Sequence, residues 1–194
     1  MVIFFVFLLG FGLFFSISSA VDLAKASKTD VDFNSLNSSE FKDGMFVKGI
    51  VYEIYDEYAY ETTDSRVSNR YYIVPLFDSF DTEVPQYVTV SIGNSELQKK
   101  ADSLMKQTWD YYDYGTEPAV WDEFEVVGEV KALDVELLGY LYEWFMYGDP
   151  TATREDYSQY ICPYEISFVS IDGMRTGAIV FGVMALVGAI GLSV

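Results

Sequence analysis

Residues 45–60 read MFVKGIVYEIYDEYAY, a run dominated by β-branched and aromatic residues. This composition is typical of a β-strand that packs on a half-buried sheet surface. Gly49 lies inside the run, where a glycine favours a bulge or a sharp bend. We therefore predict one long, bent first strand over residues 45–60, and we interpret the rest of the chain outward from it.

Further strands follow this run. Residues 62–70 (TTDSRVSNR) are polar and typical of a turn that ends the first strand. The next strands are predicted at 71–77 (YYIVPLF), 87–92 (YVTVSI), 124–133 (FEVVGEVKAL) and 164–171 (YEISFVSI). Pro75 places the second strand at a sheet edge or at a bulge, because proline cannot donate to a strand ladder.

Two amphipathic helices are predicted between these strands. Apolar residues recur at helical spacing in 96–112 (ELQKKADSLMKQTWDYY), and Ser95 with Gln98 fits a capping box at its start. A second helix is predicted at 135–147 (VELLGYLYEWFMY), with Asp134 as its N-cap.

The element order is therefore strand, strand, strand, helix, strand, helix, strand. Five strands, a bent first strand and a helix between the third and fourth strands resemble the OB-fold, a small Greek-key barrel. The resemblance implies an α+β protein with a small OB-like five-stranded β-barrel over 44–173 and two added helices, the second plugging the open barrel end. A generic α+β sandwich is the alternative.

Both ends of the chain lack charged side chains. Residues 2–20 read VIFFVFLLGFGLFFSISSA and residues 176–194 read TGAIVFGVMALVGAIGLSV. At about 1.5 Å per residue, either helix would cross the roughly 30 Å hydrocarbon core of a bilayer. We predict transmembrane helices at 1–20 and 174–194, with a polar tether at 21–43. For the first segment, a cleaved signal peptide and a buried soluble helix are the alternatives.

Small residues in both end segments predict that the two helices pack as an antiparallel hairpin. Close approach of the backbones, rather than hydrophobicity, drives helix association in lipid. The alternative is that small residues are simply common in membrane helices. The residues predicted at the contact are Gly12, Ser16, Ala178, Gly182, Ala185 and Ala189.

Composition excludes several kinds of chemistry. The chain has 30 acidic and 12 basic residues, a net charge of −18, no histidine and one cysteine. A Ser-His-Asp or Cys-His site, a histidine-ligated metal and an intrachain disulfide are therefore excluded. The charge also repels phosphates, so nucleic acid is not an expected partner.

The 16 tyrosines supply candidate binding residues, because tyrosine combines a large apolar face with a polar tip. The alternative is that many are ordinary half-buried strand residues. The candidates are Tyr55, Tyr58, Tyr60, Tyr111, Tyr112 and Tyr114. Residues 109–118 (WDYYDYGTEP) also place Asp110, Asp113 and Glu117 in an oxygen-rich loop that suits Ca²⁺, although the EF-hand spacing is absent. We expect no cofactor, with Ca²⁺ there as the alternative, and single out no catalytic residue.

The whole chain also resembles uncharacterised Firmicutes-type bacterial membrane proteins that carry an OB-like insert between two spans. The resemblance is carried by the end segments, the charged helix and the stretches GMFVKGIVYEIY (44–55), YYIVPLFD (71–78) and YVTVSI (87–92). It implies the architecture and the source, but no activity.

The predicted location is the cell membrane, with two passes. Lys25, Lys28 and Arg175 beside the spans favour a cytoplasmic domain, but the loop exceeds the length over which that rule holds. A domain rich in Tyr, Ser, Thr and Asp with almost no Cys favours the extracytoplasmic side, which we prefer.

The expected function is a non-enzymatic, membrane-anchored interaction or scaffold module that presents an acidic, Tyr-rich domain. Its expected partners are the lipid bilayer, a membrane protein or a second copy, and a carbohydrate or cationic ligand. One alternative is a carboxylate-dependent, Ca²⁺-assisted extracytoplasmic hydrolase. Another is an accessory subunit of a membrane complex.

Overall fold

The structure, a computed structural model, describes residues 2–77 and 84–193. The chain divides into two units: Met1–Thr29 with Val169–Val194, here called the helical hairpin, and Asp30–Phe168, here called the sheet domain. Met1 and Val194, at the ends of the predicted membrane segments, and residues 78–83, inside the predicted barrel, lie outside the described residues.

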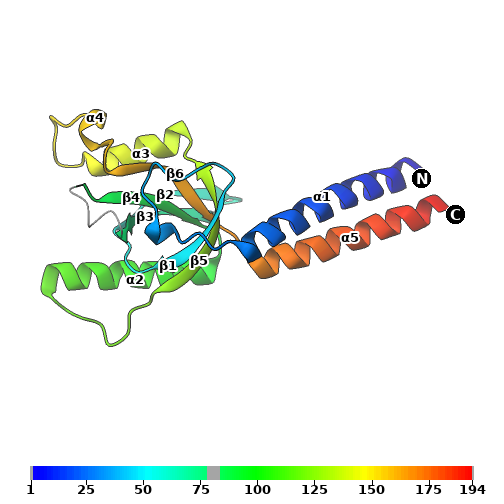
Figure 1. Ribbon diagram of the computed structural model, residues 1–194, viewed down its shortest axis with the longest axis horizontal. Helices are drawn as coiled ribbons and strands as arrows, with labels where there is room; N and C mark the ends of the chain where they lie inside the picture. Colours follow the sequence, from blue (N-terminus) through cyan, green and yellow to red (C-terminus); the bar gives the residue numbers. More distant parts are fainter. Residues whose placement is uncertain (1, 78–83, 194) are drawn as a thin grey trace. The chain divides into compact units, whose positions relative to one another are not determined.

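The helical hairpin consists of α1 (Val2–Lys28) and α5 (Ile171–Ser193), which lie side by side and antiparallel (Figure 1). Both helices are long and apolar enough to cross a membrane, as judged by length and composition. Each is longer than the sequence predicts. α1 continues past residue 20 through the start of the predicted tether, and α5 begins before residue 174.

The sheet domain is built on one six-stranded sheet with the order β1-β5-β6-β4-β3-β2 (Figure 1). All neighbouring strands are antiparallel except β4 and β6, which are parallel. The strands are β1 (Phe46–Val51), β2 (Asp56–Thr63), β3 (Arg66–Leu76), β4 (Gln86–Ile92), β5 (Phe124–Ala132) and β6 (Ile161–Phe168).

The sheet corrects the prediction of a five-stranded OB-like barrel, because it has six strands and is open. The run 45–60 forms two strands, β1 and β2, separated at residues 52–55, and these are the two edges of an open sheet. Gly49 is not the bend. It pairs with Val126 inside the β1–β5 ladder, and a Cβ there would lie 2.6 Å from Cε1 of Phe33. The glycine is therefore needed for packing.

The β2–β3 turn is much shorter than the predicted 62–70. Only Asp64 and Ser65 form it, with φ values of 50° and 63°. Positive φ at both central residues is typical of the type I′ hairpin turn, whose twist matches that of the strands. The polar residues on either side therefore continue the strands, and β3 begins at Arg66.

The helices of this domain are α2 (Ser95–Tyr114), α3 (Val135–Phe145), the short α4 (Arg154–Tyr157) and the 3₁₀ helix η1 (Phe33–Ser35). The side chain of Asn94, not Ser95, caps α2 by accepting from the backbone N–H groups of Glu96 and Leu97, each at 3.0 Å. Asp134 caps α3 as predicted, accepting from the N–H of Leu137 at 2.8 Å.

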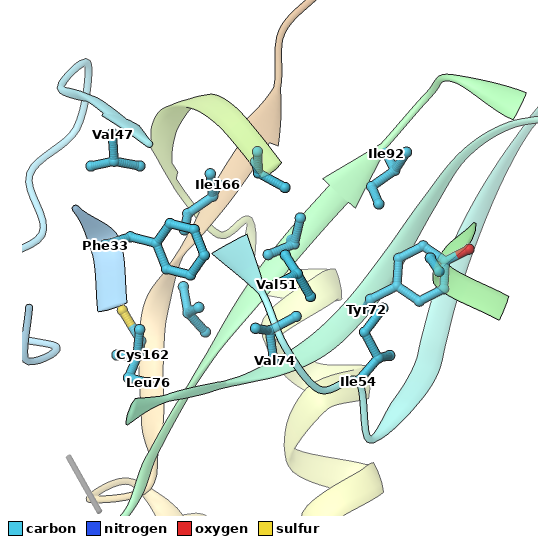
Figure 2. Close-up of a cluster of buried hydrophobic side chains, with 14 of the residues drawn as sticks. Phe33, Val47, Val51, Ile54, Tyr72, Val74, Leu76, Ile92, Cys162 and Ile166 are labelled. Atoms are coloured by element: carbon cyan, nitrogen blue, oxygen red, sulfur yellow. The ribbon is translucent and has the colours of Figure 1, made fainter. Parts of the chain in front are cut away.

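The core of the sheet domain has two parts. The larger is shown in Figure 2, where Phe33, Val47 and Tyr72 are among the buried side chains. Phe33 lies within the predicted tether, yet it is fully buried, so this segment packs into the core rather than linking two parts loosely. The tether prediction overlooked the two buried phenylalanines, Phe33 and Phe41.

The smaller part of the core lies under α3. Leu141 of α3 packs with Ile73 and Ile161, whereas Tyr72 and Val74 belong to the larger core. Since successive strand residues point to opposite faces, α3 covers the face of the sheet opposite the main core. It does not plug a barrel end, because its apolar residues pack on this face with the strand residues Ile73 and Ile161.

Candidate ligand-binding site

The connection between β1 and β2 positions the first residues of the candidate site. Ile54 is fully buried in the main core and anchors this short segment. The backbone N–H of Tyr55 also donates to the carbonyl oxygen of Ile73, at 2.9 Å. With Ile54 held inside, the side chains of Tyr52 and Glu53 remain partly accessible.

The last turns of α2 are tied to this connection by side-chain hydrogen bonds. The indole Nε1 of Trp109 donates to the carbonyl oxygen of Tyr55, at 2.6 Å. The hydroxyl of Tyr112 donates to Oε2 of Glu53, at 3.1 Å, and the hydroxyl of Tyr55 donates to that of Tyr112, at 3.3 Å. These bonds fix the Glu53 carboxylate on the side of α2.

Aromatic contacts continue outward from these hydrogen bonds. The rings of Tyr55 and Tyr112 stack with centroids 6.0 Å apart. Two further pairs are edge-to-face. Tyr52 and Phe77 have centroids 5.2 Å apart at 88°, and Tyr111 and Trp121 have centroids 5.9 Å apart at 73°. Offset and edge-to-face pairs of this kind are the preferred aromatic geometries.

The two edge-to-face pairs border a pocket of about 490 Å³. We call it the aromatic-acidic pocket, and its lining residues are Tyr52, Glu53, Phe77, Tyr111, Glu117, Trp121 and Glu123. This volume is within the range of small-molecule sites, roughly 300–1,000 Å³. Four of the residues are aromatic, three are glutamates, and none of the lining residues in the described part of the chain is basic.

Burial raises the pKa of the two tyrosines behind the pocket, Tyr55 and Tyr112. Loss of solvent raises the pKa of Tyr55, and its hydrogen bond with Tyr112 raises it further. Loss of solvent also raises the pKa of Tyr112, and the nearby Glu53 carboxylate adds to the increase. Both phenols therefore remain neutral hydrogen-bond donors at physiological pH.

The structure divides the predicted tyrosines among three places. Tyr111 lines the aromatic-acidic pocket, and Tyr55 and Tyr112 support it from behind. Tyr58 and Tyr60 lie on β2 and line a separate pocket of about 340 Å³ with Glu57, Ala59 and Tyr140. Tyr114 is 78% exposed and lines neither pocket.

Sequence reasoning missed most of the pocket, namely Tyr52, Glu53, Phe77, Trp121 and Glu123. Tyr52 and Glu53 stand beside the predicted Tyr55, so a search of that segment would have found them. Phe77 and Trp121 are far from it in sequence. Only the strand pairing and the return of the chain after α2 bring them there.

The three predicted metal ligands are not arranged around one point. Asp110 forms an ion pair with Lys106 one helical turn earlier, and Glu117 lines the aromatic-acidic pocket. Over residues 2–77 and 84–193, no group of three or more acidic or cysteine side chains could hold a metal ion. The geometry therefore gives the Ca²⁺ alternative no support.

In the helical hairpin, five of the six predicted small residues lie at the contact between α1 and α5, namely Gly12, Ser16, Ala178, Gly182 and Ala185. A Cβ on Gly12 would stand 2.6 Å from the backbone nitrogen of Ala185. The Ser16 hydroxyl donates to the carbonyl oxygen of Ala178 at 3.1 Å, and a Cβ on Gly182 would lie 3.5 Å from that hydroxyl oxygen.

The contact extends beyond the predicted residues toward the N-terminal end of α1. A Cβ on Gly188 would lie 2.5 Å from the backbone nitrogen of Leu9, and one on Gly191 would overlap the ring of Phe5. Ala189, predicted at the contact, is half-buried, and its carbonyl oxygen accepts from the hydroxyl of Ser193.

These features define a class of protein in which an acidic α+β domain with an aromatic pocket lies, in sequence, between two long apolar helices. The chain belongs to the family described as a domain of unknown function (DUF8577), whose model matches residues 1–194. No curated protein and no solved structure matches the chain.

Proposed function

We propose that this protein is a non-enzymatic binding module, held at a bacterial cell membrane by two passes. The observation that carries the proposal is the aromatic-acidic pocket, in which four aromatic side chains and three carboxylates from separate segments meet. Aromatic residues are enriched at binding interfaces because they bury a large area at a small entropic cost. The two long apolar helices support the membrane anchor.

We also propose that the sheet is the open form of an OB-like barrel. β1 and β2 are the two edges of the sheet, yet only residues 52–55 separate them in sequence. Together they correspond to the long, bent first strand of an OB-fold, which pairs with both ends of the sheet. The parallel β4–β6 pair and the position of α2 between β4 and β5 further support this reading.

The proposed side of the membrane is extracytoplasmic. A cysteine placed at Tyr147, which is 92% exposed, tests this with a membrane-impermeant maleimide applied to intact cells. The native Cys162 is buried and serves as an unreactive internal control. Labelling of Y147C before lysis is the expected result, and labelling only after lysis would place the domain in the cytoplasm.

Site-specific photo-crosslinking tests the binding module itself. A photo-reactive phenylalanine analogue at Tyr111, inside the pocket, should capture a reproducible partner from native membranes. The matched control is the same analogue at Tyr114, which is three residues further along α2 but outside the pocket lining. Capture at neither position, or equal capture at both, would overturn the proposal.

A carboxylate-dependent hydrolase is the second candidate, and the three glutamates sharing one pocket favour it. Under this alternative, purified protein would turn over a glycan or peptide substrate, and E117Q or E123Q would abolish the turnover. Turnover that survives both substitutions would exclude these carboxylates as the catalytic groups.

A further inference from the structure

We propose that the aromatic-acidic pocket binds an organic cation, namely the alkylammonium or guanidinium group of its ligand. The inference rests on the proposed binding function and names the chemistry that the same site recognises. Four observations carry it: the charge of the lining, the absence of an internal cation, the aromatic geometry and the size of the space.

The charge of the lining selects a cation. Glu53, Glu117 and Glu123 border the pocket, and the chain as a whole carries a net charge of −18. A cleft lined by charge of one sign concentrates oppositely charged solutes and repels the others. An anionic ligand is therefore disfavoured, and a neutral sugar carries no net charge for the three carboxylates to attract.

The protein does not neutralise these glutamates itself. Among the residues that the structure describes, no ion pair involves Glu53, Glu117 or Glu123. Lys106 on α2 is paired with Asp110 instead. The Glu53 carboxylate is also held in place by the Tyr112 hydroxyl, which donates one neutral hydrogen bond and leaves the negative charge uncompensated.

The aromatic side chains supply the rest of the recognition. The four rings that line the pocket with the glutamates form two edge-to-face pairs, Tyr52–Phe77 and Tyr111–Trp121. Cations are attracted to ring faces, most strongly to that of tryptophan, and quaternary or alkylated ammonium groups are often bound this way. Carboxylates combined with aromatic faces therefore match an organic cation better than a bare ion.

Size and ligand geometry separate an organic cation from a metal. The pocket holds about 490 Å³, which accommodates a side chain or a small amine. Ca²⁺ requires six to eight oxygen ligands at 2.3–2.6 Å. Within the described ranges, no three acidic side chains gather closely enough for that.

The test uses the full chain in dodecyl maltoside micelles, which carry no ammonium group, with binding measured by titration calorimetry. The first probe is N-acetylarginine amide, and its control is N-acetylcitrulline amide, which has nearly the same shape without the charge. We expect the citrulline probe to bind at least about tenfold more weakly, and added salt to weaken the arginine probe alone. Equal binding of the two probes would overturn the inference.

Two further probes distinguish the sources of the cation. 1,4-Diaminobutane represents a free amine, and an acetylated, amidated Gly-Arg-Gly peptide represents a side chain presented by a protein. Tighter binding of the peptide assigns the pocket to a basic segment of a partner, and tighter binding of the diamine assigns it to a small amine. Failure of both to bind would overturn the inference.

Matched variants locate the binding. E117Q/E123Q should weaken N-acetylarginine amide about tenfold, and Y111L should weaken it about fivefold. The control E143Q/E155Q removes the same charge from exposed glutamates on α3 and α4, and should leave binding unchanged. Equal weakening in both double variants would mean that net charge, not the pocket, attracts the probe, which contradicts the inference.

These outcomes separate this inference from the proposed function. If crosslinking at residue 111 persists in E117Q/E123Q and the arginine and citrulline probes bind equally, the binding module stands and the cation inference fails. If the analogue at residue 111 captures no partner even when both glutamates are present, the proposed function fails. Near-UV circular dichroism of each variant confirms that the fold is retained.

Discussion

The helical hairpin and the sheet domain are packed in opposite ways. In the hairpin, the closest contacts occur where side chains are missing, as at Gly12 and Gly188, which leave room for the backbone of the other helix. In the sheet domain, Phe33 and Tyr72 are fully buried, and large side chains fill the interior. The comparison shows one chain using two sources of stability, close backbone approach and burial of apolar volume.

The two units also differ in where their large apolar side chains lie. Ile3 on α1 is 86% exposed and Leu186 on α5 is 63% exposed, whereas Val47 and Ile54 of the sheet domain are fully buried. Apolar outer surfaces of this extent mark contact with another apolar phase. They agree with the proposed membrane anchor, since lipid would cover them.

The largest expected effect is in the sheet domain. Phe33→Ala should lower the free energy of unfolding by about 3–5 kcal/mol, because it empties a fully buried aromatic site. Denaturant unfolding followed by near-UV circular dichroism measures it. Val31→Ala, at an exposed neighbouring position, is the control. A loss below about 1 kcal/mol would show that this segment is a simple tether after all.

The next effect is in the hairpin and compares two glycines on one helix. Gly12→Leu should destabilise the α1–α5 contact by about 1–3 kcal/mol, because the Cβ of the new leucine would lie 2.6 Å from the backbone nitrogen of Ala185 on α5. Gly10→Leu is the matched control, since a Cβ there meets nothing within 4 Å. Equal effects of the two substitutions would contradict the packing described above.

Disulfide trapping in membranes measures that contact. The reporter pair is S19C with G177C, since a Cβ at residue 177 would lie 3.7 Å from Oγ of Ser19. Burial raises the pKa of the native Cys162 thiol to about 12, which keeps it out of the reaction. Crosslinking should be fast in wild type and in the Gly10→Leu background, and slow with Gly12→Leu.

A smaller effect tests the polar contact of the same hairpin. Ser16→Ala removes the hydrogen bond to the carbonyl oxygen of Ala178, and such bonds are worth about 0.6 kcal/mol in membranes. The same crosslinking assay should show a slight slowing. Ser18→Ala, on the exposed side of α1, should show none. A large effect of Ser16→Ala would mean that hydrogen bonding, rather than backbone approach, holds the helices.

The smallest expected effect is a gain in stability, and it concerns the half-buried carboxyl group of Glu165 in the sheet domain. Burial raises the pKa of Glu165 above its ordinary value of 4.5, although Lys131 opposes the increase. The folded state therefore keeps this proton to higher pH than the unfolded state, and stability falls as pH rises through the folded-state pKa. Glu165→Gln should match wild type at pH 4 and exceed it at pH 7–8.

Denaturant unfolding across that pH range checks this expectation. Glu125→Gln, at an exposed position on β5, is the control and should leave the pH dependence unchanged. A Glu165→Gln variant that loses stability at pH 7–8 would show that the ionised carboxylate is stabilising. The local cause of the burial is the position of Glu165 on an inner strand, opposite Thr89 and Lys131 in the neighbouring strands.

Much of the secondary structure was predictable because local patterns determine it. The alternation in 87–92 became β4, and Asp134 capped α3 as its position before an apolar run indicated. The errors arose where two signals compete. The polar residues of 66–70 suggested a turn, but an exposed edge hairpin accepts polar side chains, and Asp64-Ser65 is a weaker turn signal than Asn-Gly.

The candidate site was only partly predictable, because non-local contacts assemble it. The density of tyrosines alone indicates Tyr111, and nothing in its sequence neighbourhood indicates that Phe77 lines the same pocket. The hairpin contact was more accessible, because helical spacing by itself places Gly12 and Ser16 on one face. The contact face of a long helix can thus be predicted from sequence spacing. The residues that meet on the surface of a mixed sheet cannot be predicted until the strand order is known.

The short pairing of Asp32 with Lys48 gives the segment after α1 a protective role. It covers part of the outer edge of β1, and the N–H of Lys48 donates to the carbonyl oxygen of Val31 at 2.9 Å. An uncovered edge strand is a template on which other chains can assemble into aggregates. A fragment that began at β1 would therefore expose this edge and be more prone to fibril-like assembly. Any soluble version of the domain should start at or before Asp30.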